Sequence, residues 1–338
     1  MAHQRPPHID VDKRRSMVRS MQAMLGIGMY AAGYGARAQE GSSIVLQGLD
    51  GWLFAGWGSL TQVDQAAITA NTRLIAQAQQ LLAQHGTELQ VLLLPDKIRF
   101  YLSKLPQGKV MSEAVLQRYA LISQALQDAQ VRTFDGNEVL RQVQASGQEV
   151  FYRTDQHWTL PAADATAKAT AQMILSSTPQ LRGEPGSGQK LGEISSERRF
   201  GDLAELFLPQ EERRRLGREV FTVRRQAAAQ GLLDEAPAPV HITGHSMMQP
   251  YYGFPQMLSH QLDRPVSLNW KSGNVGPWVM LLEYLNSPLF KQTKPQVLVW
   301  QMFEPTYSYA PDASGFWDVD SLMSSESWLS RVRTALQG

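Results

Sequence analysis

Two spacings of hydrophobic residues alternate along this chain. Short apolar runs, typical of strands buried on both faces, are separated by segments whose hydrophobic residues lie three and four positions apart, as on one side of an amphipathic helix. The clearest run is Leu89–Leu94, which ends at Pro95. A helical pattern over residues 64–85 precedes it, and Gly86 is the expected stop of that helix. The alternation predicts an α/β fold with a mainly parallel sheet.

The same criteria place the remaining elements. Residues 48–54 contain an Asp-Gly turn that leads into a short strand. Residues 178–236, rich in Gly, Pro, Arg and Glu, are interpreted as an insertion packed on the rim of the sheet. The tail beyond Tyr307 is expected to end in a short amphipathic helix around Trp328–Leu336. We further expect strands over residues 131–134, 240–243, 265–268 and 297–300, and helices over residues 115–126, 161–175, 254–262 and 278–285.

Composition narrows the class of protein. The chain has 338 residues, 43% of them hydrophobic and 19% charged, which is ordinary for a globular protein with one large core. Residues 1–38 hold six of the 32 Lys and Arg residues but two of the 31 Asp and Glu residues, so the rest of the chain is slightly acidic. Without a basic stripe, no nucleic-acid partner is expected. The lack of cysteine in the sequence excludes thiol nucleophiles, disulfides and Cys-ligated metal sites.

The first 38 residues have the layout of a secretory signal. Basic residues at 13–15 and 19 precede an uncharged, largely apolar stretch over residues 21–34, and Ala36-Arg37-Ala38 matches a small-x-small cleavage site. The apolar stretch of about 14 residues is short for a membrane-spanning helix. We therefore expect export, with residues 39–338 as the functional domain. Removal of the segment, its retention as a membrane anchor and a plain amphipathic N-terminal helix remain open alternatives.

Ser246 is the candidate nucleophile. It follows the strand expected over residues 240–243, and Gly244 allows the backbone to turn tightly between the two. A serine on a sharp turn at the carboxyl end of a strand is exposed to substrate, and its own N–H can help to hold an oxyanion. The alternative is a serine that caps a helix, which is a common structural role.

Asp155 and His157 are the candidate acid and base. In an extended segment, residues two apart point to the same side, so the carboxylate can fix the tautomer of the imidazole and stabilise its protonated form. The alternatives are a structural Asp–His hydrogen bond and a metal site, which needs further ligands. His245 is a rival base because it adjoins Ser246, although neighbouring side chains on a strand-to-turn step usually diverge.

Several further residues are candidates for oxyanion or substrate binding. The turn Gly273–Pro277 follows the expected strand at 265–268, so Asn274 is a possible amide donor unless the turn is purely structural. Gln301 follows the last expected strand, where sites of α/β proteins lie, whereas for Glu304 the alternative is an ion pair with a basic neighbour. Candidates for stacking on, or hydrogen bonding to, a sugar are Arg153, Trp158, Tyr251, Tyr252 and Trp278, each of which is otherwise a packing residue.

Short motifs spread over about residues 44–305 resemble the alginate O-acetyltransferase family of AlgJ and AlgX, which are SGNH-hydrolase-like proteins of the bacterial periplasm. The motifs are Gly48-x-Asp50-Gly51-Trp52-Leu53-Phe54, Leu94-Pro95-x-Lys97, Tyr152-x-x-Asp155-x-His157-Trp158-Thr159, Gly201-Asp202-Leu203 and Gly244-x-Ser246. The resemblance implies a three-layer SGNH-like domain with a central insertion, and a triad of Asp155, His157 and Ser246. His245 departs from the small polar residue expected between the glycine and the serine.

The resemblance also implies an activity. The protein would be a periplasmic O-acetyltransferase that carries an acetyl group on Ser246 and passes it to hydroxyls of an exopolysaccharide, without a metal or cofactor. A membrane-bound acyltransferase of the MBOAT type would supply the acyl group. A carbohydrate esterase with the same triad and a non-catalytic polysaccharide-binding subunit are the alternatives.

Overall fold

The computed structural model describes residues 45–226 and 237–338. The expected secretory segment, residues 1–38, lies outside the described residues. Within the described ranges, no helix combines the length and the apolar character that crossing a membrane requires.

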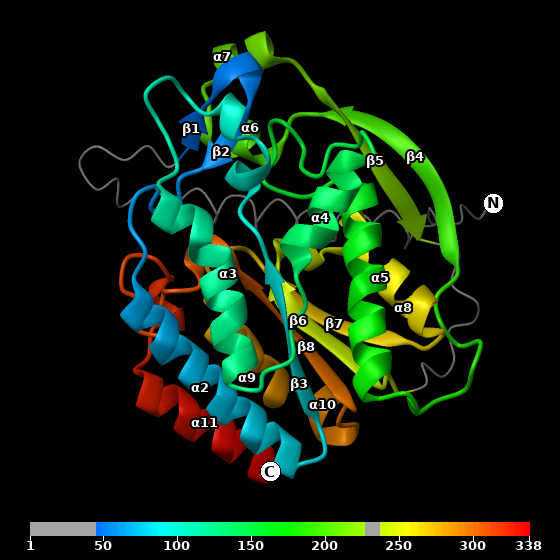
Figure 1. Cartoon of the computed structure of the whole chain (residues 1–338). Coiled ribbons are helices and arrows are strands. Elements are labelled where there is room, and N and C mark those ends of the chain that lie inside the picture. Colours follow the sequence, from blue (N-terminus) through cyan, green and yellow to red (C-terminus); the bar gives the residue numbers. More distant parts are fainter. Residues whose placement is uncertain (1–44, 227–236) are drawn as a thin grey trace, which may run out of the picture.

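A four-stranded parallel sheet forms the centre of the molecule (Figure 1). Its strands lie in the order β3 (Glu88–Leu94), β8 (Val297–Phe303), β6 (Val240–His245) and β7 (Val266–Lys271). Every neighbouring pair is parallel. The predicted α/β class is confirmed, and the carboxyl ends of all four strands lie at one edge of the sheet.

Alternation within the strands explains why both faces of the sheet are covered. In β3, Leu89, Val91 and Leu93 pack into one apolar core, whereas Leu92 and Leu94 pack into the other. Because successive side chains of a strand point to opposite faces, an almost continuous apolar run requires helices on both sides.

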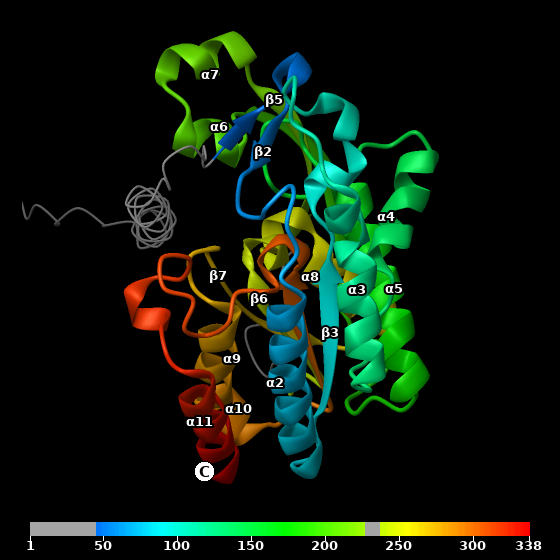
Figure 2. The ribbon, with the colours of Figure 1, turned by 60° about the vertical axis from the view of Figure 1, so that its left-hand side comes forward.

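The helices form the two outer layers. One face carries α2 (Gln65–Gln84), α9 (Pro277–Leu285), α10 (Pro288–Gln292) and α11 (Ser325–Gln337), whereas the other carries α4 (Gly136–Ala145), α5 (Leu160–Ser177) and α8 (Phe254–Leu262). Figure 2 shows α2, α9 and α11 on one side of β3 and α4 and α5 on the other. Helix α3 (Glu113–Asp128) contributes side chains to both cores. Single-turn 3-10 helices lie in the connections: η1 (Leu49–Gly51), η2 (Lys97–Phe100), η3 (Leu102–Lys104), η4 (Ser246–Met248), η5 (Pro250–Tyr252), η6 (Glu304–Thr306) and η7 (Val319–Ser321).

Two details differ from the sequence predictions. The strand expected over residues 131–134 is wrong, because only Arg132 makes an isolated bridge, to Gln90 beside β3. Helix α4 was not predicted: it is short, and its one apolar face consists of only three side chains, Val139, Leu140 and Val143, of which Leu140 alone is fully buried.

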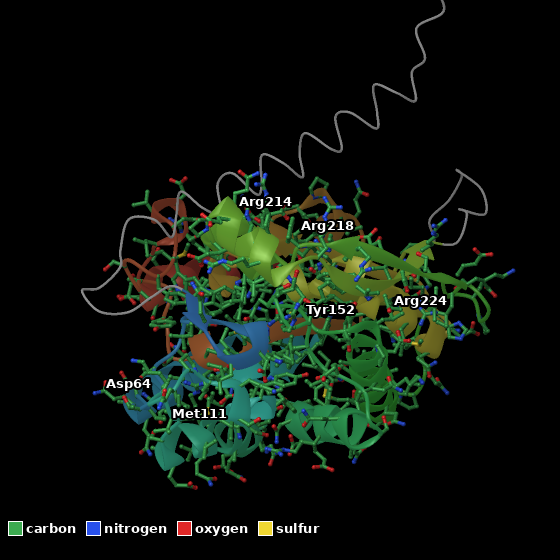
Figure 3. The ribbon with its side chains drawn as sticks, turned by 90° about the horizontal axis from the view of Figure 1, so that it is seen from above. Asp64, Met111, Tyr152, Arg214, Arg218 and Arg224 are labelled. Atoms are coloured by element: carbon green, nitrogen blue, oxygen red, sulfur yellow. The ribbon has the colours of Figure 1, made fainter. Side chains whose placement is uncertain are left out.

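Smaller elements lie over the carboxyl edge of the sheet. Strands β1 (Val45–Gln47) and β2 (Leu53–Ala55) form an antiparallel pair. The insertion contains a second antiparallel pair, β4 (Leu191–Arg199) and β5 (Glu219–Gln226), with α6 (Asp202–Phe207) and α7 (Gln210–Leu216) between its strands. Figure 3 looks down on this end, where Arg214, Arg218 and Arg224 mark the insertion.

The tryptophan cluster between α9, α11 and β8 gives a test of the packing. The Trp328 side chain is fully buried, donates its indole N–H to the Trp278 carbonyl at 2.8 Å, and stacks on Trp300. We expect Trp328→Ala to lower the free energy of unfolding by about 3–5 kcal/mol, measured by urea denaturation. Trp270, which is 39% exposed, is the matched control; equal losses for Trp270→Ala and Trp328→Ala would contradict this packing.

Candidate active site

Ser246 lies directly after β6, at the carboxyl edge of the sheet. It is half-buried and begins the 3-10 helix η4. The expected strand-turn-serine arrangement is present, but the α-helix does not follow at once, because η4 and η5 separate Ser246 from the start of α8 at Phe254.

A tight loop holds Asp155 beside His157. Residues 153–157 form a series of bends closed by the bridge between Phe151 and Trp158. Asp155 Oδ1 accepts the backbone N–H of His157 at 2.8 Å and lies 2.7 Å from its Nδ1. The expectation of an extended segment is therefore wrong. The two side chains meet because the carboxylate folds back onto the backbone two residues later, as in an Asx turn.

The structure joins the two sequence segments at one point. His157 Nε2 lies 2.8 Å from Ser246 Oγ, and the imidazole stacks on the ring of Tyr252 with 4.2 Å between centroids. When Nδ1–H is donated to Asp155, Nε2 is the ring nitrogen with a free lone pair. It can then accept the hydroxyl proton of Ser246, which is the geometry required to activate a serine.

Positive and negative groups around the pair set its electrostatics. Asp155 Oδ2 accepts the backbone N–H of Asp202 at 2.9 Å and lies 3.4 Å from Nη2 of Arg199. Burial alone raises the pKa of Asp155, but the charges of His157 and Arg199 and the hydrogen bonds from His157 outweigh it, so the pKa lies well below its usual range. Asp155 is therefore ionised at neutral pH.

Asp202 places a second carboxylate against the base. Its Oδ2 lies 3.3 Å from His157 Nδ1, while Oδ1 accepts the backbone N–H of Gln156 at 2.7 Å. Burial and the neighbouring Asp155 charge raise the pKa of Asp202 to about 7. For His157, burial lowers the pKa, but Asp155 and Asp202 together raise it above its ordinary value. Sequence reasoning gave Asp202 no role, although it belongs to the Gly201-Asp202-Leu203 motif.

Asp202 also bears on the metal-site alternative for Asp155 and His157. One atom each from Asp155, His157 and Asp202 lies within 4.8 Å of the others, close enough to hold an ion. Both Asp155 oxygens, however, already accept N–H donors, and the guanidinium of Arg199 stands beside one of them. This arrangement favours a hydrogen-bonded triad over a cation site.

Lys97 fixes the loop that carries Asp155 and His157. Its buried ammonium donates hydrogen bonds to the carbonyls of Leu53 at 2.6 Å, Arg153 at 3.1 Å and Asp155 at 2.9 Å. Burial lowers the pKa of Lys97 to about 8. Gly201 presses on the same loop, because a Cβ there would lie 2.3 Å from the carbonyl of Thr154. No sequence signal separated this lysine from surface lysines except its place in the Leu94-Pro95-x-Lys97 motif.

A cavity of about 30 Å³ adjoins the triad. His157, His245, Ser246, Gln301 and aromatic side chains that include Phe303 line it. His245 turns away from Ser246, since its Nε2 lies 2.9 Å from the carbonyl of Val275, and burial lowers its pKa to about 4. His245 therefore lines the cavity, and His157, not His245, is the residue positioned to act as the base.

Other predicted residues lie away from the cavity. Trp158 and Trp278 are buried in the two cores, so the prediction that their rings stack on a sugar is wrong. Asn274 donates its side-chain N–H to Asp318 Oδ2 at 3.3 Å and does not line the cavity. Arg153 donates to the backbone carbonyls of Asp50 and Leu216.

The remaining candidates have defined partners near the site. Tyr251 is half-buried, donates to Glu197 and carries Arg199 over its ring. Tyr252 is buried and supports His157, so its ring is not free for a sugar. Glu304 pairs with Arg99 and Arg118, at 3.2 Å in each case, as the structural alternative expected.

A protein-family model and several proteins of known sequence match this chain. The family model described as "SGNH hydrolase-like domain, acetyltransferase AlgX" matches residues 45–304. Two proteins described as probable alginate O-acetylase AlgJ, from Pseudomonas fluorescens and Pseudomonas putida, are 28% and 30% identical to this chain. These alignments cover 92% and 86% of this chain, and 78% and 77% of the relatives.

Solved structures agree with this assignment. The O-acetyltransferase domain of Pseudomonas putida AlgJ superposes with a TM-score of 0.69 at 26% sequence identity, covering 86% of this chain and 98% of that domain. The structure of Pseudomonas aeruginosa AlgX, at 17% identity and a TM-score of 0.57, covers 87% of this chain and 67% of its own and shares the fold.

The two carboxylates around His157 predict a pH dependence. The base must be neutral to take the Ser246 proton, and the negative charge of Asp202 favours the protonated imidazole. Asp202→Asn removes that charge, so the acid limb of kcat/KM with p-nitrophenyl acetate should move to lower pH. Asp164→Asn, at a carboxylate paired with Arg224, should leave the limb in place. An acid limb that stays or moves to higher pH in Asp202→Asn would show that Asp202 does not act on His157.

The hydrogen bonds from Lys97 to three carbonyls predict a large effect on stability. Lys97→Met removes the shared donor of three carbonyls. The Arg153 carbonyl keeps the N–H of Leu53 at 3.0 Å, whereas the loss at the carbonyls of Leu53 and Asp155 costs about 1–3 kcal/mol each. We expect the free energy of unfolding to fall by about 3 kcal/mol or more, measured by urea denaturation. Lys104→Met, at an exposed pair with Asp50, should change it by less than about 1 kcal/mol. A similarly small change in the free energy of unfolding in both variants would show that Lys97 does not hold the loop.

Proposed function

The chain belongs to the SGNH hydrolase-like acetyltransferase family AlgX and is an O-acetyltransferase, and we propose that it acetylates hydroxyl groups of an exopolysaccharide through an acetyl ester on Ser246. The observation that carries this proposal is the continuous chain of contacts from Asp155 Oδ1 to His157 Nδ1 at 2.7 Å and from His157 Nε2 to Ser246 Oγ at 2.8 Å.

Each step of the proposed reaction uses these three groups. Ser246 Oγ attacks the carbonyl carbon of an acetyl donor while its proton passes to His157 Nε2. The tetrahedral intermediate collapses, and the leaving group takes that proton. A polysaccharide hydroxyl then attacks the acetyl-serine and gives its proton to His157, which returns it to Ser246 Oγ as the ester bond to the serine breaks. Asp155 stabilises the imidazolium in both halves.

The acceptor class is supported by the relatives, which are described as alginate O-acetylases. We propose an acceptor of this chemical class, a secreted polysaccharide with free hydroxyls, without choosing among alginate, cellulose and other glycans. No cofactor is required, because an activated acetyl ester or thioester supplies both the group and the driving force.

The proposal includes a location and a donor partner. The basic and apolar pattern of residues 1–38 supports export to the periplasm, where the same segment can serve as an anchor to the inner membrane. Acetyl-CoA is a cytoplasmic donor, so an exported enzyme needs its acetyl group passed across the membrane. We propose that a membrane-embedded acyltransferase of the MBOAT type does this.

Mass spectrometry of the acylated protein tests the mechanism. After exposure to p-nitrophenyl acetate, the native chain should gain one acetyl group on Ser246, and Ser246→Ala should gain none. The matched control is Ser272→Ala, whose hydroxyl donates to Asn274 Oδ1; this variant should acylate like the native chain. An unmodified Ser246 in the native chain would end the acyl-serine proposal.

The fate of the ester separates transfer from hydrolysis. In the presence of an oligosaccharide, acetylated sugar is the expected product. Free acetate alone, at the same rate with and without the sugar, would identify a carbohydrate esterase. Acetylation of polysaccharide that persists in cells carrying Ser246→Ala would identify a non-catalytic subunit.

A further inference from the structure

Gln301 presents a buried amide donor beside the nucleophile. The residue lies near the end of β8, its side chain is fully buried, and it lines the cavity that contains Ser246. Its Nε2 has no hydrogen-bond partner among the residues that the structure describes. Unpaired buried donors are destabilising and rare in native proteins, so this one requires an explanation.

The backbone of the serine turn fixes the orientation of this amide. Gln301 Oε1 lies 2.8 Å from the backbone nitrogen of His245, the residue before Ser246. A backbone N–H can only donate, so the atom that it meets must be the amide oxygen. The amide nitrogen is then the free end of the group, and a flipped amide would place two donors against each other.

Gly244 allows this approach. A Cβ at residue 244 would lie 2.7 Å from the Cβ and 2.8 Å from the Oε1 of Gln301. Any side chain there would push Gln301 away from the turn. The glycine of the Gly-x-Ser segment thus makes room for the amide, in addition to its place in the turn.

We propose that Gln301 Nε2 donates a hydrogen bond to the oxyanion that forms during acetylation and deacetylation of Ser246. This inference rests on the proposed function. When Ser246 Oγ bonds to the acetyl carbon, the π electrons of the carbonyl move to its oxygen, and the proton of Ser246 moves to His157. The negative oxygen needs a donor until the leaving group departs and the C=O bond forms again.

The dimensions of the cavity agree with this role. Its volume of about 30 Å³ is room for about two water-sized groups. An acetyl carbon bonded to Ser246 carries two such groups, the carbonyl oxygen and the methyl group. Gln301 supplies a polar wall for the oxygen, and Phe303 supplies an apolar wall for the methyl group.

An unpartnered donor is well suited to a transition state. A donor that has no partner in the resting enzyme makes its bond only when the charge develops, so no existing bond has to be broken. The other amide considered for this role, that of Asn274, is already bonded to Asp318. The Ser246 N–H at the start of η4 provides a natural second donor.

Two substitutions of Gln301 test the inference, because the loss of the Nε2 donor is the one change that they have in common. Gln301→Glu keeps an oxygen for the His245 N–H but adds a charge, whereas Gln301→Met adds no charge but removes that acceptor. Both remove the Nε2 donor. The measurement is the burst rate of p-nitrophenol release from p-nitrophenyl acetate by the full chain, with intact mass reporting acetyl-Ser246. We expect both variants to acylate about 10²–10³-fold more slowly, with KM nearly unchanged.

Controls separate this result from misfolding and from failure of the proposed function. Asn274→Ala, a buried amide outside the cavity, should acylate within about threefold of the native chain. Circular dichroism and thermal unfolding establish that each variant is folded, and if Gln301→Met unfolds, Gln301→Glu alone decides. A folded Gln301 variant that acylates within threefold of the native rate overturns the inference while the acyl-serine mechanism stands. A native chain that gains no acetyl group overturns both.

Discussion

The carboxylate of Asp155 is the interaction on which the site depends. Its Oδ1 accepts the backbone and side-chain N–H of His157, and its Oδ2 accepts the backbone N–H of Asp202 and faces Arg199. Charge-assisted bonds of this kind are about twice as strong as neutral ones. The backbone carbonyl of the same residue is held by Lys97. One buried group thus orients the base and binds the insertion to the catalytic loop.

The insertion is therefore part of the candidate active site and not an appendage to the sheet. Glu219 of β5 accepts the backbone N–H groups of Arg153 at 2.6 Å and Thr154 at 2.9 Å, and β4 ends at Arg199. A loop of bends cannot satisfy its own N–H groups as a helix or strand does. The insertion supplies the missing acceptors, so the loop keeps the one conformation in which His157 reaches Ser246.

The features that could be predicted from the sequence were those written in local periodicity or in reactive side chains. The strands and most helices followed from apolar spacing, because the side chains of a strand or a helix return to the same face every few residues. The proximity of Asp155, His157 and Ser246 followed from the chemistry that needs them together. Arg199 and Glu219 could not be found this way, because their partners lie 44 and more positions away in the sequence. Aromatic identity did not predict exposure either: Trp158 is core, whereas Trp270 is 39% exposed.

The small cavity bears on the choice between water and a sugar hydroxyl. In the proposed mechanism both nucleophiles use His157 as the base, so the triad itself does not discriminate between them. In the proposed acetyl-enzyme, the acetyl group would take up most of the cavity of about 30 Å³ beside Ser246. The attacking hydroxyl must then arrive from the accessible side of the half-buried serine. A bound polysaccharide can hold its hydroxyl at that point and raise its effective concentration far above that of a passing water molecule. On the proposed mechanism, selectivity for transfer is therefore a property of the surface around Ser246, and not of the three residues of the triad.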